Sequence, residues 1–180
     1  MSSAGAIIMS VFAAIWWLVG VRASGYGSPP LTYGIPLVVT GLIVIAALRG
    51  RDRLEQVSPE EDARRGRVVG IASGGEGVAI LVAVNVLAYA GRSDYAAPVI
   101  AIIVGLHFVP LAKWLPARLY YGTCALLVVL GICGFLIRRP DLRLLIVSIG
   151  AACILWITCV IVVLGLKRNT HDRQRSAPAA

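Results

Sequence analysis

The sequence predicts an all-α fold, a polytopic transmembrane bundle of six helices. Fifty-eight percent of its residues are hydrophobic and the mean hydropathy is +0.84, whereas soluble domains are about 45–50% apolar. Only 14% of the residues are charged, against roughly 25% in soluble chains, and these charges collect between the apolar runs. Because a spanning helix needs about 20 apolar residues, the 180 residues have room for six spans and no soluble domain.

Six apolar runs follow one another along the chain, and the expected spans are 4–21, 31–48, 68–91, 95–112, 119–137 and 144–166. The one long polar segment, "RGRDRLEQVSPEEDARRGR", occupies 49–67. Within it, Ser58 as a cap, Pro59 at the first helical position and Glu61 three residues after the serine predict a short helix along the membrane surface. The polar tail 167–180 lacks apolar periodicity and is expected to be disordered.

The distribution of Lys and Arg predicts the orientation. Twelve of the 17 lie in the 49–67 and 113–118 loops and the C-terminal tail, and five lie in the other three loops. Positive loops stay in the cytoplasm, so both termini are expected there, in a bacterial-type plasma membrane. Arg138 and Arg139 are the exception, since they fall on the side expected to be outside. The arginines of 49–67 either contact anionic lipid head groups or only set the topology, which needs no further assumption.

Several other classes of protein are disfavoured. A net charge of +8 is compatible with nucleic-acid binding, but arginines flanking membrane spans explain it, and no nucleic-acid-binding motif is present. The four cysteines all lie inside apolar runs without a CxxC pair, so we expect no disulfide scaffold, no metal site and no cofactor. The "VRA" before Ser24 resembles a signal-peptide cleavage site, but no positive charge precedes the first run and that run is long for a signal core.

One ionisable residue interrupts the third run, Glu76 in "SGGEGVAI". It lies about 12 Å from the cytoplasmic end of this span, near the middle of a bilayer. Comparable ionised groups at the centre of a spanning helix cost about 2.5–3.5 kcal/mol to insert, so Glu76 needs a partner, a proton or water.

The candidate partner is His107 in "VGLHFVPLA" of the fourth run. The third and fourth runs are joined by a few residues, which makes them antiparallel neighbours. The depths of the two side chains then differ by about 6 Å, a gap that helix tilt and side-chain length can bridge. Pro110 also leaves the carbonyl of Leu106 without its helical donor, and that carbonyl could hold a water or accept from the imidazole.

Small residues surround Glu76 on its helix and predict close helix packing. Its own side carries Ala72, Ser73, Ala79, Ala83 and Ala90. Gly70 with Gly74 forms a GxxxG pair, and Ser73 with Gly77 forms a second pair of small residues. Asn85 is on the opposite side of the helix, where we expect it to make a hydrogen bond to another helix.

Two interpretations of Glu76 and His107 stay open. In the first, the pair exchanges a proton at physiological pH and couples it to a small polar solute, with Ser73 beside it. In the second, the pair only fixes helix packing. Intramembrane ionisable groups favour the first, but the absence of an inverted repeat, common in transporters, favours the second. A serine hydrolase is disfavoured, because "IASGG" lacks the first glycine of a GxSG motif.

The "GGEG" of the third run and the "GLHFVPLA" of the fourth resemble small bacterial six-helix integral membrane proteins of uncharacterised function. The resemblance covers these two runs and implies a membrane domain built around them, without implying an activity. The chain does not resemble the four-helix multidrug exporters, whose key glutamate lies in the first helix.

The sequence therefore favours a small integral membrane protein that moves or senses a proton or small polar solute through Glu76 and His107. The alternative is an accessory or structural membrane protein without catalytic activity. The expected partners are the lipid bilayer and a small molecule but no nucleic acid, and self-association into a homo-oligomer is left open.

Overall fold

The computed structural model describes residues 3–25, 28–51, 59–114 and 118–175. These ranges form six long helices and no strand: α1 (Ser3–Ser24), α2 (Ile35–Arg51), α3 (Pro59–Tyr89), α4 (Ala96–Trp114), α5 (Leu119–Leu136) and α6 (Pro140–Arg175). Each contains a stretch long and apolar enough to cross a membrane. The predicted all-α fold with six candidate spans is confirmed.

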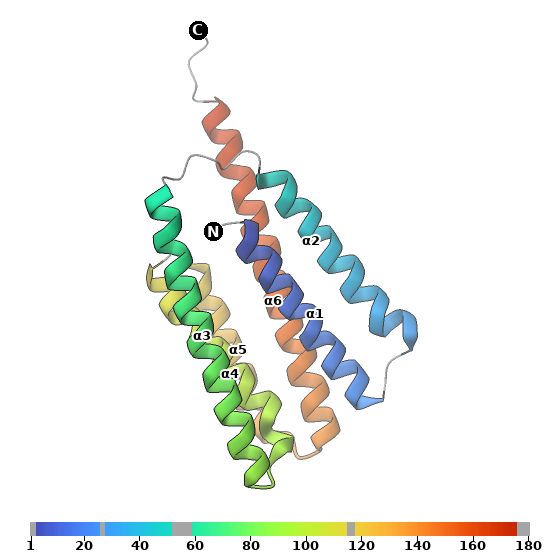
Figure 1. Ribbon diagram of the computed structural model, residues 1–180. Helices are drawn as coiled ribbons and strands as arrows, with labels where there is room; N and C mark the ends of the chain where they lie inside the picture. The colour runs from blue at the N-terminus through green and yellow to red at the C-terminus, as the bar shows by residue number, and fades with distance from the viewer. Residues whose placement is uncertain (1–2, 26–27, 52–58, 115–117, 176–180) are drawn as a thin grey trace.

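Helix α6 lies at the centre of the bundle, where it contacts α1, α2, α4 and α5. Figure 1 shows α1, α2 and α6 grouped on one side and α3, α4 and α5 on the other. Helix α3 lies at the edge, because its packing partners among the described residues are α4 and the short 3-10 turn η2 (Ser93–Tyr95). With an even number of helices, α1 begins and α6 ends at the same end of the bundle (Figure 1).

Prolines mark the beginnings of three helices, among them Pro140 at the start of α6, as expected for a residue whose missing N–H would have no helical partner there. Pro30 opens a π-helical turn, η1 (Pro30–Gly34), which continues directly into α2. Pro59 begins α3, where the sequence predicted a helix start, and the expected cap Ser58 lies outside the described residues.

The structure differs from the sequence interpretation after Pro59, since no separate surface helix forms. Helix α3 runs without interruption through 31 residues into the third span, a length of about 46 Å. Extending an existing helix adds one hydrogen bond per residue, whereas a second helix needs a costly new nucleus.

Helix α6 is also longer than expected, because it continues past the sixth span to Arg175. This places 167–175 of the expected disordered tail in the same helix, again by extension of a helix already formed. The last part of the tail, 176–180, lies outside the described residues.

Helix α3 ends in a glycine motif that sends the chain back into α4. Gly91 has a positive φ of 66°, a conformation that glycine adopts without steric cost. Its N–H donates to Ala88 O at 3.1 Å, and the N–H of Arg92 donates to Leu87 O at 2.8 Å, the two bonds of a Schellman motif. The predicted antiparallel pairing of the third and fourth spans is therefore present.

Helices α4 and α5 approach closely at glycines. A Cβ at Gly105 would lie 3.1 Å from Leu127 Cβ, and a Cβ at Gly131 would lie 2.7 Å from the carbonyl oxygen of Pro98. Leu127 is fully buried between these helices and α6. These contacts hold α4 firmly and so fix the surface on which α3 rests.

Candidate functional site

The structure brings Glu76 and His107 together between α3 and α4. Glu76 Oε2 lies 3.4 Å from His107 Nδ1, and the side chains are 12% and 10% exposed, respectively. The imidazole also faces the backbone of Ala72, one turn before Glu76 on α3. In the described part of the chain, His107 is the one ion-pair partner of Glu76.

Helical spacing explains why Glu76 faces α4. Apart from Val68, the half-buried residues of α3 recur every three or four positions and form one narrow face: Val69, Ala72, Glu76, Ile80, Ala83 and Leu87. Val69, Ala72 and Ile80 pack against the core. The carboxylate thus occupies an inward position on a helix that is otherwise held by apolar contacts.

The geometry of the Glu76–His107 pair leaves one nitrogen of the imidazole without a hydrogen bond. Nδ1 of His107 has no hydrogen-bond partner among the described residues, although Glu76 Oε2 is within ion-pairing distance. The contact is close enough for charge attraction but not aligned as a hydrogen bond. A small rotation of either side chain would align a shared proton between the two atoms, which is the chemistry that such a carboxyl–imidazole pair offers.

Ser73 does not join this pair. It is exposed on α3 and makes no hydrogen bond to either side chain in the part of the chain that the structure describes. The predicted face of small residues is also narrower than expected, because Ala79 and Ala90 are exposed while Ala72 and Ala83 are half-buried.

The glycines predicted to pack against other helices face open space within this chain. A Cβ added to Gly70, Gly74 or Gly77 would meet no atom within 4 Å. The tight approaches occur instead at Gly20, Gly105, Gly131, Gly134 and Gly150. A GxxxG pair permits close approach but does not select a partner, and α3 meets α4 through another face.

Asn85 makes a different contact from the one the sequence suggested, whereas Pro110 lies inside its helix, as in the expected span 95–112. The exposed Asn85 donates from Nδ2 to Leu81 O in its own helix at 2.8 Å, so no interhelical hydrogen bond forms within the chain. Pro110 is half-buried inside α4, which continues to Trp114. The proline therefore does not end the helix.

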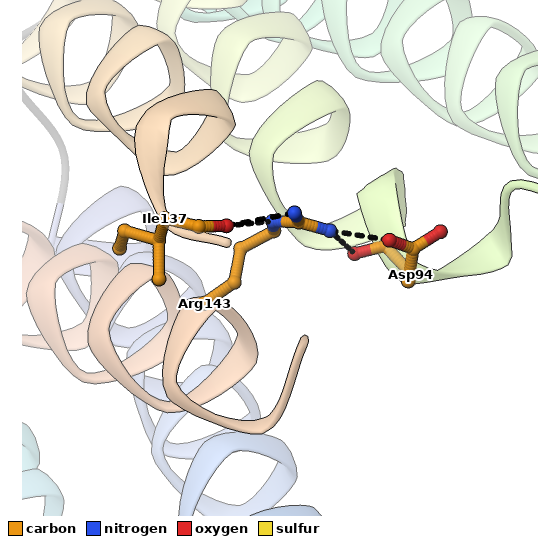
Figure 2. A network of polar contacts seen from close by, with 3 residues as sticks. All are labelled: Asp94, Ile137 and Arg143. Carbon is orange, nitrogen blue, oxygen red and sulfur yellow. Dashed lines mark hydrogen bonds and ion pairs between the residues drawn. The ribbon is translucent and has the colours of Figure 1, made fainter. Parts of the chain in front are cut away.

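Sequence analysis missed a second polar site, centred on Arg143. Figure 2 shows its guanidinium between the carbonyl of Ile137 and the carboxylate of Asp94. Nε and Nη2 donate to Ile137 O at 3.0 and 2.7 Å, and Nη1 donates to Asp94 O at 3.2 Å and to Asp94 Oδ2. The guanidinium carbon also lies 3.9 Å from the centroid of the Tyr95 ring. One side chain thus ties the α3–α4 connection to the α5–α6 connection.

A pattern in the sequence could have identified Arg143 as buried. It precedes the buried residues Val147, Ala151 and Leu155 at intervals of four, so it begins the inward face of α6. In the sequence, Arg143 was counted only as a positive charge in a loop.

Hydroxyl groups make further contacts between helices. Thr123 and Thr158 do bond to their own helices, at Leu119 O and Ile154 O, and their Oγ1 atoms are also 2.9 Å apart across α5 and α6. Thr40 donates across to Ser10 O on α1 at 3.3 Å. These contacts stabilise the bundle and lie apart from the Glu76 pair.

The described residues contain no group of three or more His, Cys, Asp or Glu side chains that could hold a metal ion. The fold and the site define an all-helical protein with six helices apolar enough to span a membrane and one carboxylate–imidazole contact between two of them. Comparisons of the chain with protein-family models, with curated proteins and with solved structures found no match.

Proposed function

We propose that this chain is an integral protein of a plasma membrane, with both termini in the cytoplasm, that binds and releases a proton at Glu76 and His107. In this proposal the proton is linked to the movement or sensing of a small polar solute. The observation that supports it is the 3.4 Å contact between Glu76 Oε2 and His107 Nδ1, two ionisable groups on helices apolar enough to span a bilayer. Such groups inside a membrane mark proton and solute pathways in many proteins.

The position of α3 at the edge of the bundle supports a link between proton binding and a movement of α3 relative to α4. No residue of its span, Gly66–Tyr89, is fully buried, and it packs mainly on α4 and η2 among the described elements. Elements with few buried contacts are those that open most easily. Electrostatic interactions are strong in a medium of low dielectric constant. Gain or loss of a proton by Glu76 or His107 therefore alters the attraction between α3 and α4.

The test asks whether Glu76 takes up a proton in the folded protein. Purified full-length protein in mild detergent is treated with dicyclohexylcarbodiimide, which attacks protonated carboxyls in apolar surroundings, across a pH series. Intact mass and peptide mapping report the modified residue. We expect labelling at Glu76 that fades as the pH rises and is missing in Glu76→Gln. The absence of labelling at every pH would contradict the proposal, because it would indicate a carboxylate held permanently in its ion pair.

A second candidate is an accessory or structural membrane protein, in which the pair only holds α3 on α4. The absence of a hydrogen-bond partner for His107 Nδ1 among the described residues disfavours this structural role. The absence of a hydrogen bond from Ser73 to the pair favours it. A flux assay distinguishes the two functions. It uses proteoliposomes that contain the pH indicator pyranine and carry a potassium diffusion potential. Proton flux that disappears in Glu76→Gln at unchanged folded yield supports proton transfer. No flux in the parent, together with loss of folded Glu76→Gln protein, supports the structural role.

A further inference from the structure

A groove of about 370 Å³ lies where α3 ends, α4 begins and α5 ends. It is lined by Leu87, Arg92, Tyr95 and Phe135, so one guanidinium meets three apolar or aromatic side chains. It is a shallow groove that opens widely onto the surface of the bundle. It lies at the opposite end of α3 from Pro59, where that helix begins, and it plays no part in the Glu76 pair.

The walls of the groove are held by contacts that other parts of the fold supply. The Schellman motif bonds the Arg92 N–H to Leu87 O, which places these two residues side by side. The Tyr95 ring stacks on Phe135 with centroids 5.5 Å apart and an interplanar angle of 16°. Arg143, buried and bonded to Asp94 and Ile137, lies against the same tyrosine ring. The groove is therefore formed before any ligand binds.

The charge of the groove is positive and is not neutralised by its neighbours. The guanidinium carbon of Arg92 is 5.8 Å from the Tyr95 centroid, and Arg92 makes no ion pair with any described residue. The nearest acidic residue in the sequence, Asp94, is already paired with Arg143. Exposed Arg138 and Arg139 follow shortly after Phe135 and add positive charge to this end of the bundle.

The groove also lies at a defined level along the spans. Leu87 is in the last turn of the candidate span Gly66–Tyr89, and Phe135 is in the last turn of Leu119–Leu136. Arg92 follows the end of the first of these spans. In a bilayer this order places the apolar wall at the edge of the hydrocarbon and the guanidinium among the head groups, where the phosphates of phospholipids lie.

We propose that this groove binds one anionic phospholipid, with its phosphate on Arg92 and the upper part of an acyl chain against Leu87, Tyr95 and Phe135. Arginine forms bidentate hydrogen bonds with phosphate, and apolar and aromatic side chains at the end of a span pack against the upper part of an acyl chain. A free phosphate would use the guanidinium alone, whereas the lipid also covers the aromatic wall. This proposal does not depend on proton transfer at Glu76.

The test is native mass spectrometry of the full chain released from detergent, with added phosphatidylglycerol or phosphatidylcholine of the same acyl chains. We expect phosphatidylglycerol to be retained in preference to phosphatidylcholine. Arg92→Gln should weaken phosphatidylglycerol binding at least ten-fold, because the phosphate loses its hydrogen bonds to a charged group, and Arg92→Lys should cause a smaller loss, because it keeps the charge but not the bidentate contact. Arg22→Gln is the matched control, because it removes one arginine from the last turn of α1, at the same end of the bundle, without touching the groove.

Two further arms make the result decisive. Phe135→Ala should also reduce phosphatidylglycerol binding, and excess inorganic phosphate should not displace the lipid. Circular dichroism checks that each variant keeps its helical content. Equal binding of the two lipids, or equal losses in Arg92→Gln and Arg22→Gln, would overturn the proposal. Displacement by inorganic phosphate with no effect of Phe135→Ala would overturn it as well, by showing a simple anion site.

Discussion

Arg143 is a charged side chain that the fold buries almost completely, with 2% of its surface exposed. Its burial is acceptable because every nitrogen of the guanidinium donates to an oxygen of Asp94 or Ile137. Ile137 is the C-cap of α5, so the positive charge also lies at the negative end of that helix dipole. Arg143 therefore stabilises the end of α5 and the connection between α3 and α4 together.

Arg143→Gln is expected to lower the free energy of unfolding by about 3 kcal/mol, because it leaves a partly buried carboxylate and a carbonyl without their donor. Arg143→Lys should recover only part of this loss, since an ammonium cannot form the same fork of bonds. Denaturant titration in detergent, followed by circular dichroism, measures both values. Arg139→Gln, an exposed neighbour, should stay within about 0.5 kcal/mol of the parent. An equal effect of the Arg143 and Arg139 substitutions to Gln would show that the buried network contributes nothing.

The contact between Glu76 and His107 could be predicted from the sequence. The short link between their helices, the helical rise and the need of a buried carboxylate for a partner all point to it. Arg143 was missed because its partners come from two other connections, Asp94 and Ile137, and no local pattern joins them.

At the scale of helices, some glycines pack closely against a neighbouring helix, whereas others face open space. Gly131 lies where α5 meets α4, and an added Cβ would be 2.6 Å from Ile102 Cγ1 and 2.7 Å from the Pro98 carbonyl oxygen. The backbone oxygen cannot move aside without shifting the helix. Gly74 on α3 has nothing within 4 Å of an added Cβ.

Gly131→Ala is therefore expected to reduce the free energy of unfolding by about 1–3 kcal/mol, the usual cost of overpacking. Gly74→Ala should leave it unchanged or raise it by up to about 1 kcal/mol, because alanine is the better helix former. Both variants can be followed by the same denaturant titration. Equal destabilisation by the two changes would mean that α3 packs through Gly74. A change of oligomeric state in Gly74→Ala alone would instead support a contact between two chains.

Over the whole molecule, the even number of helices places the beginning of α1 and the end of α6 at one end of the bundle (Figure 1). Six crossings of a membrane by these helices would put both termini on the same side. Lys and Arg are more frequent in the segments on that side of the bundle, which predicts that both termini lie in the cytoplasm.

Reporter fusions test this arrangement. A green fluorescent protein fused to either terminus should fluoresce, since it folds in the cytoplasm, and alkaline phosphatase at the C-terminus should stay inactive. Phosphatase activity at the C-terminus would contradict the orientation. Opposite results at the two termini would contradict six crossings.

The sequence by itself determined the six apolar helices, the start of α3 at Pro59, the antiparallel pairing of α3 with α4 and the pairing of Glu76 with His107. These features depend on composition, helix geometry and short connections, which are local properties of the chain. Only the tertiary structure decided that α6 is central, that α3 lies at the edge, which glycines are in contact and that Arg143 is buried. The physical reason is that lipid and protein interior are similarly apolar, so hydropathy does not separate a face that meets lipid from a face that meets another helix.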